Sequence, residues 1–339
     1  MSKVTYVIVG GYFYSGSSAV VDLLKEYISC FECGAEIRFI NDPYGLIQLE
    51  NSLTDNWDWI RAGMALDDYC ELCLKLSRKK DRMPFRAFGM GYTDNLNPYF
   101  VEITMDFINK LTDFEYDNDF YAYQAKTNYV QYILNRWRLG IEIYSKQLFK
   151  VHKKRMVRHA HPSKEEYYGA VKEYIDKLFK YQIDKQGKEY IIMDQAIHPR
   201  DSYVINRYFN NGKMIIVDRD PRDMFVQSIL SGAVDYDNSS KAGSNFAKLQ
   251  SSLHERNIDA QNVLEIHFED LVYDYGKTVN KIESFLDLDP DKHVMKRKYF
   301  NPDISKKNIG LWRKYYDKYN EAIDVIAREM PGYITGRWA

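Results

Sequence analysis

A glycine-rich turn between an apolar run and a helical pattern constrains the fold of this chain most. The apolar run covers residues 4–9, and helical periodicity begins at Ser17. Between them, Gly11 and Gly16 keep the Gly-x-x-x-x-Gly spacing of a phosphate-binding loop, but Ser17 stands where such loops usually carry a lysine. A turn of this kind presents backbone N–H groups to an anion at a helix N-terminus. The alternative is a tight turn capped by Ser15 or Ser17.

Strand-like and helical segments alternate along much of the chain. Apolar runs recur at 189–194, 213–220 and 262–270, and a short strand is expected at 36–40. Apolar strands that alternate with helices predict a parallel sheet covered on both faces. We therefore predict the α/β class, with a three-layer, mostly parallel sheet and a P-loop nucleotide hydrolase-like core. Residues about 42–182 show no clear strands and predict a helical insertion.

The composition is that of a soluble globular protein with a sizeable core. Of 339 residues, 45% are hydrophobic and 28% charged, and the net charge of -1 gives no general attraction to nucleic acid or to anionic membrane. We find no signal peptide and no apolar stretch long enough to span a bilayer, and expect a cytoplasmic location. The pairs Cys30/Cys33 and Cys70/Cys73 are then expected to be buried, reduced thiols, with a zinc site as the alternative.

Together with the rest of the chain, the glycine-rich turn resembles the loop of the sulfotransferase family. That loop reads Arg or Lys followed by Ser-Gly-Thr-Thr and holds the 5′-phosphate of 3′-phosphoadenosine 5′-phosphosulfate (PAPS). Here it reads Tyr14-Ser15-Gly16-Ser17-Ser18. The resemblance implies that Ser15, Gly16, Ser17 and Ser18 bind PAPS as donor co-substrate, with no metal. Tyr14 replaces the basic residue, so it supplies a hydrogen bond but no charge.

A second family element lies in the stretch MIIVDRDPRDMFVQS. Arg219 follows the strand, and Pro221 suits the first turn of a helix. In the family this arginine binds the 3′-phosphate together with a serine eight positions on. Gln227 occupies that position here and Ser228 follows it, so both are candidates. Three more charged residues at this helix start are expected to be solvated: Asp220, Arg222 and Asp223.

The third element is SKKNIGLWRKY, which resembles the family's basic loop ahead of a Gly-x-Trp. Gly310 and Trp312 keep the spacing. By this match Lys306 falls on a phosphate-binding lysine of the family, while Ser305 and Lys307 replace an arginine and a glycine. The resemblance therefore places Lys306 and Lys307 among the PAPS-binding residues.

The stretch CGAEIRFI resembles the second strand of tyrosylprotein and some glycan sulfotransferases. Sulfuryl transfer to a hydroxyl needs a base for the acceptor's proton and a positive group for the leaving oxygen. The resemblance implies that Glu36 is the base, with Arg38 and Tyr14 beside it. Glu36 and Arg38 can instead form a structural ion pair, and Asp194 and His198 are rival bases at the end of another strand.

The sequence predicts one sulfotransferase-like domain over residues 1–339, in which the insertion shapes the acceptor site. The predicted reaction moves a sulfuryl group from PAPS to a hydroxyl acceptor, a carbohydrate or glycoconjugate of polysaccharide biosynthesis. The alternatives are an atypical phosphotransferase or nucleotide hydrolase of the same fold, and a non-catalytic nucleotide-binding scaffold. A basic run at 151–164 is interpreted as a solvated loop or as a surface for an anionic acceptor.

Overall fold

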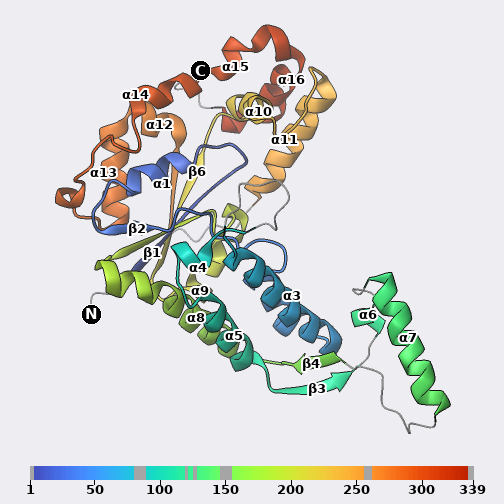
Figure 1. Ribbon diagram of the computed structural model, residues 1–339. Helices are drawn as coiled ribbons and strands as arrows, with labels where there is room; N and C mark the ends of the chain where they lie inside the picture. Colours follow the sequence, from blue (N-terminus) through green and yellow to red (C-terminus); the bar gives the residue numbers. More distant parts are fainter. Residues whose placement is uncertain are drawn as a thin grey trace.

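A computed structural model describes residues 4–79, 89–118, 121–124, 128–145, 155–255 and 262–334. A five-stranded sheet in the order β2-β5-β1-β6-β7 lies at its centre, and all neighbouring strands are parallel (Figure 1). The strands are β1 (Thr5–Gly11), β2 (Cys30–Glu32), β5 (Tyr190–Asp194), β6 (Gly212–Asp218) and β7 (Val263–His267). The predicted α/β class is confirmed, and so are four of the predicted strands.

Alternate side chains of the strands face two separate cores, which makes the molecule three-layered. Val7, Val9 and Ile215 pack in a smaller core against one set of helices. Tyr6 and Ile8 point to the other face, into a larger core. The helices of the smaller core are α1 (Ser18–Leu24), α12 (Phe268–Tyr273) and α13 (Tyr275–Leu286).

The larger core contains buried residues from helices before and after β5 in the sequence. Buried residues of α3, α5 and α8 pack together there with residues of the sheet. Its helices are α2 (Leu46–Glu50), α3 (Trp59–Ser77), α4 (Tyr92–Asn95), α5 (Phe100–Leu111), α8 (Lys164–Gln186), α9 (Ile205–Tyr208), α10 (Pro221–Leu230), α11 (Ser240–His254), α15 (Leu311–Lys314) and α16 (Tyr316–Glu329). The short α14 (Pro302–Ser305) precedes α15.

The structure differs from the predicted pattern at two places. Residues 42–182 contain an antiparallel pair of short strands, β3 (Phe114–Asn118) and β4 (Arg155–His159), which the sequence pattern missed because β3 has no buried face. The expected strand at 36–40 is wrong: β2 ends at Glu32, and Gly34, with φ of +74°, turns the chain out of the sheet. Residues 36–40 therefore form a loop beyond the carboxyl end of β2.

Two helices project from the body of the molecule beyond the β3–β4 pair. They are α6 (Tyr121–Gln124) and α7 (Tyr129–Tyr144), drawn in green in Figure 1. No described residue of α7 is buried. Among the helices of the described ranges, none has the length and apolar character needed to cross a membrane.

Candidate active site

A cavity of about 1050 Å³ lies at the carboxyl edge of the sheet. Every strand contributes to its wall through residues at or just beyond its carboxyl end, because all five strands end at this edge. In sheet order these are Glu36 after β2, Asp194 and Gln195 at β5, the loop 11–18 at β1, Arg219 after β6 and Phe268 after β7. Ligands of open parallel sheets bind at such an edge.

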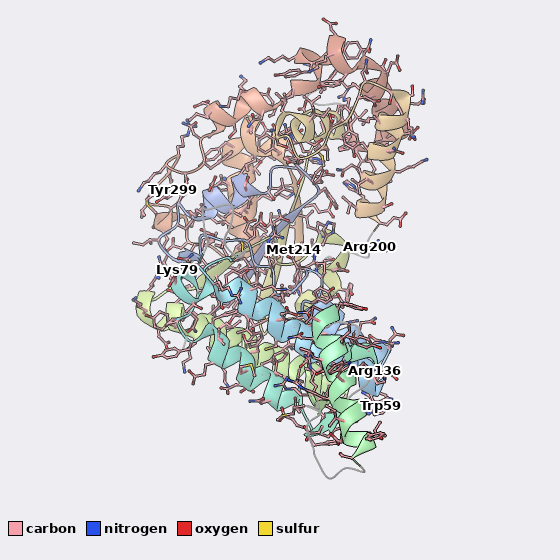
Figure 2. All side chains as sticks on the ribbon, turned by 45° about the vertical axis from the view of Figure 1, so that its right-hand side comes forward. Trp59, Lys79, Arg136, Arg200, Met214 and Tyr299 are labelled. Carbon is pink, nitrogen blue, oxygen red and sulfur yellow. The ribbon has the colours of Figure 1, made fainter. Side chains whose placement is uncertain are left out.

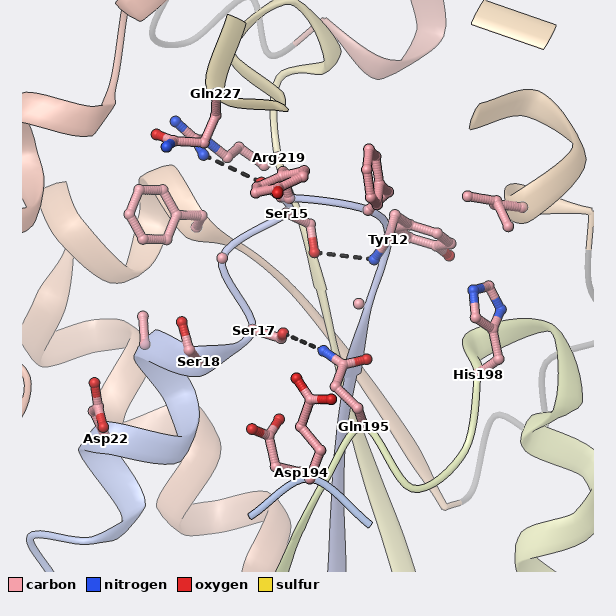
Figure 3. Close-up of a pocket in the computed structure, with 18 of the residues that line it drawn as sticks. Tyr12, Ser15, Ser17, Ser18, Asp22, Asp194, Gln195, His198, Arg219 and Gln227 are labelled. Carbon is pink, nitrogen blue, oxygen red and sulfur yellow. Dashed lines mark hydrogen bonds between the residues drawn. The ribbon is translucent and has the colours of Figure 1, made fainter. Parts of the chain in front are cut away.

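Hydrogen bonds to two of its serine side chains fix the glycine-rich loop (Figure 3). Ser15 Oγ accepts a hydrogen bond from the Tyr12 N–H at 3.0 Å, and Ser17 Oγ accepts one from Gln195 Nε2 at 2.6 Å. Ser17 therefore ties the loop to β5 and makes no side-chain cap for α1. Gly16 has φ of +89°, and a Cβ there would lie 2.8 Å from Cδ2 of Phe268, so only glycine fits.

Tyr14 stands in a left-handed conformation, with φ of 63°. Its carbonyl oxygen accepts a hydrogen bond from Arg219 Nη1 at 3.2 Å, and its phenol oxygen accepts one from Ser231 Oγ at 2.6 Å. The loop backbone and the arginine that follows β6 are thus linked directly. Tyr14 lines the cavity, as does each of the four PAPS-binding candidates of this loop: Ser15, Gly16, Ser17 and Ser18.

Arg219 is 4% exposed and lines the cavity beside Gln227 (Figure 3). Its Nη2 donates to the carbonyl oxygen of Asn308, and its guanidinium lies 5.1 Å from the Phe268 ring centroid. Nε of Arg219 is buried with no hydrogen-bond partner in the described part of the chain. The other candidate, Ser228, does not line the cavity: it is fully buried and its Oγ donates to the Phe225 carbonyl at 2.7 Å.

The expected solvation of Asp220, Arg222 and Asp223 is wrong, because all three are buried. Asp220 caps the start of α10 and pairs with Arg222, whose guanidinium stacks 4.0 Å from the Trp312 ring centroid. Asp223 accepts hydrogen bonds from the N–H groups of Gly310 at 2.7 Å and Trp312 at 3.0 Å. These partners come from the C-terminal segment, which a local pattern at the helix start does not reveal.

Asp223 thereby fixes the Gly-x-Trp segment against α10. Ser305 and Asn308 of this segment line the cavity, whereas Lys306 and Lys307 are exposed and do not. Lys306 Nζ lies over the Tyr273 ring, 5.4 Å from its centroid. The structure therefore brings the backbone of this segment to the site, with the two lysines outside the cavity wall.

A second cavity of about 570 Å³ shares three of its residues with the first: Glu36, Arg38 and Asp194. Arg38 pairs with Glu36 and, at 3.1 Å, with Asp42, so the alternative of a structural Glu36–Arg38 pair is present in the structure. Both side chains of that pair remain partly exposed, at 41% for Glu36 and 38% for Arg38. Lys25 and Glu32 also line the second cavity, which makes its wall strongly polar.

Asp194 and His198, the rival bases, also line the large cavity. Burial, followed by the nearby Glu36 and Glu32 carboxylates, raises the pKa of Asp194 to about 6. Its Oδ1 is buried and, among the described residues, has no hydrogen-bond partner. Burial lowers the pKa of His198, which favours the neutral imidazole. A carboxyl with a raised pKa in a cleft is typical of acid–base sites.

Glu26, just after α1, supports the wall of the large cavity, and the sequence pattern did not reveal this role. This carboxylate is fully buried and accepts hydrogen bonds from His293 Nε2 at 2.8 Å and from the N–H groups of Tyr299 and Phe300 at 2.9 and 3.0 Å. Tyr299 and Phe300 line the large cavity. The available signal was an acidic residue shortly after a mostly apolar helix, and this signal does not identify the residues that Glu26 binds.

The four cysteines are free, and all but Cys70 are buried. Burial raises the pKa of the Cys30, Cys33 and Cys73 thiols to about 12, so they are protonated near neutral pH. In the described ranges, no group of three or more His, Cys, Asp or Glu residues is placed to hold a metal ion.

The sequence model of the sulfotransferase family matches residues 119–292, just over half of the chain. Among solved structures, the sulfotransferase domain of the olefin synthase of Synechococcus PCC 7002 is 15% identical, covering 96% of this chain and 94% of that one, with a TM-score of 0.40. Sulfotransferase STF9 from Mycobacterium avium is 12% identical, covering 94% of this chain and 77% of that one, with a TM-score of 0.34. No curated protein matches the sequence.

Proposed function

The chain belongs to the sulfotransferase family, and from this premise we propose that it transfers a sulfuryl group from PAPS to a hydroxyl of a carbohydrate acceptor. One observation carries the proposal: the glycine-rich loop, Arg219 and Glu36 all line the same cavity. When bound, the donor supplies an activated sulfuryl group and a phosphate leaving group. The following paragraphs derive what the residues of this chain contribute.

The residues of the loop wall fit an anionic nucleotide. Gly16 leaves no side chain between the backbone and the cavity, and the loop leads directly into the N-terminus of α1, where the helix dipole favours an anion. Arg219 adds a fixed positive charge, with a buried Nε that lacks a hydrogen-bond partner among the described residues. We assign the loop residues Ser15 to Ser18 to the 5′-phosphate, and Arg219 with Gln227 to the 3′-phosphate. Lys306 and Lys307 lie between the lining residues Ser305 and Asn308 in the chain but do not line the cavity themselves.

Glu36 is the proposed general base. It lines both cavities, so a hydroxyl that enters from the second cavity meets it on the way to the first. Arg38 holds the Glu36 carboxylate and adds a positive charge at the same junction. Tyr14 directs its phenol toward Ser231 and provides a hydrogen bond without charge. Asp194 is the competing carboxylate, since it lines both cavities too.

The chemistry of the second cavity supports a carbohydrate acceptor. Five of its lining side chains are charged: Lys25, Glu32, Glu36, Arg38 and Asp194. A phenolic acceptor would need an apolar wall for its ring, and here Met90 and Ala35 are the only apolar side chains among the lining residues that the structure describes. A polyhydroxylated ring, by contrast, can exchange hydrogen bonds with carboxylate and ammonium groups.

Nucleotide hydrolysis is the second candidate, and one observation favours it. Asp194 ends β5, which pairs directly with β1, as the metal-holding aspartate of a nucleotide hydrolase would. Ser17 at the usual lysine position opposes it, because no cation then reaches the terminal phosphates from the loop.

The test compares ligands by thermal stability, because a ligand that binds only the folded state raises the melting temperature. We expect 3′,5′-adenosine bisphosphate to raise it, and ATP or GTP with magnesium to have little effect. Arg219→Ala should abolish the shift, whereas Lys318→Ala, an exposed basic residue outside the cavity wall, should leave it intact. Transfer of labelled sulfate from PAPS to a panel of oligosaccharides and phenols then tests the acceptor class. A shift with the triphosphates alone would replace the proposal with nucleotide hydrolysis.

A further inference from the structure

We propose that α7 docks the protein on an anionic lipid surface, with its apolar face in the headgroup region. This inference does not depend on the sulfuryl-transfer reaction. It starts from the exposure of α7: large apolar side chains that elsewhere form cores are open to solvent along its length.

Six of the eight exposed large apolar residues of α7 form one continuous stripe, and Tyr129 and Ile143 lie off it. At 100° per residue the six fall on one side of the helix. They are Val130 (66% exposed), Ile133 (38%), Leu134 (47%), Trp137 (73%), Ile141 (50%) and Tyr144 (94%). Asn128 is the N-cap of α7, and its side-chain oxygen accepts a hydrogen bond from the Gln131 N–H at 2.9 Å. Trp137 and Tyr144 carry a polar group on a large ring, as side chains at a lipid–water boundary do.

The charges beside the stripe indicate which surface it meets. Arg136 and Arg138 are exposed on its two sides. In the sequence, Glu142 is the one acidic residue between positions 136 and 154, and four lysines follow within ten residues of the end of α7: Lys146, Lys150, Lys153 and Lys154. Arg155 and Arg158, by contrast, are paired with Asp67. An amphipathic helix with an aromatic-rich apolar face and basic flanks binds the interface of anionic bilayers. This local excess of positive charge exists although the net charge of the whole chain is -1.

The position of these arginines disfavours pairing with a second copy. They lie at the middle of α7 (Tyr129–Tyr144), so an antiparallel pair centred on Trp137 would bring four arginines together. Like charges at such close range oppose association. In Figure 2, Arg136 lies near the end of the molecule opposite to Tyr299, which lines the large cavity. A lipid surface at α7 therefore leaves the cavity open.

Flotation of the full chain with vesicles tests the proposal. We expect binding to vesicles of phosphatidylcholine with about 30% phosphatidylglycerol, little binding to phosphatidylcholine alone, and weaker binding when salt rises from about 0.1 M to about 0.5 M. Trp137→Glu should lower the bound fraction by at least about tenfold, since it places a charge in the apolar stripe. Tyr99→Glu, at another exposed aromatic (59%), is the matched control and should bind normally.

Both variants should fold, because Trp137 and Tyr99 are exposed, and an unchanged melting temperature checks this. Unchanged vesicle binding by Trp137→Glu, or no binding by the unmodified protein, would overturn the proposal. So would a dimer in gel filtration that Trp137→Glu dissociates while vesicles fail to bind, since α7 would then be an interface between copies of the chain.

Discussion

The two sides of the large cavity are built differently. On the donor side, Arg219, Asp220, Arg222 and Asp223 are all less than 9% exposed, and each is tied to backbone groups or to another buried charge. On the carboxylate side, the side chains of Glu36 and Arg38 are 41% and 38% exposed, and their charged partners are each other and Asp42. Buried, satisfied networks are rigid, whereas exposed ion pairs are worth at most about 1 kcal/mol.

This difference in burial fits the role proposed for each side of the cavity. A donor site gains from groups that are already in position, because no reorganisation is needed when the ligand binds. A base must exchange its resting partner for the acceptor hydroxyl, and an exposed pair with Arg38 makes that exchange inexpensive. The comparison predicts that substitutions on the carboxylate side change turnover, and that those on the donor side change stability and affinity.

The largest expected effect is that of Glu36→Gln on turnover. Removal of the base should lower kcat by about 10²- to 10⁴-fold, while the unfolding free energy changes by less than about 1 kcal/mol and bisphosphate affinity is kept. Asp42→Asn, which removes the other partner of Arg38, is the matched control and should stay within about tenfold of normal kcat. Turnover that survives Glu36→Gln would move the role of base to Asp194.

Asp223→Asn should produce the largest loss of stability. The two oxygens of Asp223 each accept one N–H, from Gly310 and from Trp312, and an amide has only one such oxygen; Arg219 would also lose a buried countercharge. We expect the unfolding free energy to fall by about 3 kcal/mol in urea titration, with weaker bisphosphate binding because the Asn308 carbonyl no longer holds Arg219 in place. The exposed Asp235→Asn is the control; an equal loss there would refute the role of the network.

Asp194→Asn should stabilise the protein in a pH-dependent way. Because the pKa of Asp194 is raised to about 6 in the folded state, this carboxyl favours folding below about pH 4 and loses that contribution as the pH rises through 6. The asparagine variant should therefore gain about 2 kcal/mol over the unmodified protein at pH 8 and almost nothing near pH 4. An equal gain at both pH values would show that Asp194 does not titrate in this window.

The smallest expected effect is that of Tyr14→Phe, at the boundary between the two sides. It removes the hydrogen bond from Ser231, which is exposed, so the unfolding free energy should change by less than about 1 kcal/mol. If the phenol also contacts the donor, kcat falls by up to about tenfold while stability is kept. Steady-state kinetics beside a urea titration separates the two effects, and a large loss of stability would mean that Tyr14 belongs to the rigid side.

Local pattern predicted the sheet well and the site only in part. The apolar runs at 4–9, 189–194 and 213–220 are strands that are largely buried on both faces, which leaves a continuous signal, and the run at 262–270 contains the strand β7 at the edge of the sheet. Residues 36–40 look like another such run, but the glycine before them turns the chain away from the sheet. Glu36 was predicted in a strand and lies in a loop. It still lines the cavity, because this loop follows the carboxyl end of β2.

The charged residues of α10 could not be placed from sequence. Their burial depends on Gly310 and Trp312, which lie about 90 residues later, and helix-start charges are usually solvated. The same holds for Gln227 and Ser228: neighbouring positions on a helix point about 100° apart, and only the packed structure shows that Gln227 faces the cavity.

The buried Glu26 has a consequence for the order in which the protein becomes active. Its acceptor oxygens hold residues that lie 267 to 274 positions later in the chain, among them two that line the cavity. During synthesis the N-terminal residues leave the ribosome first, so the phosphate loop emerges long before the segment that completes its pocket. Contacts of such high sequence separation form late. A nascent chain should therefore acquire nucleotide affinity only after residue 300 has emerged.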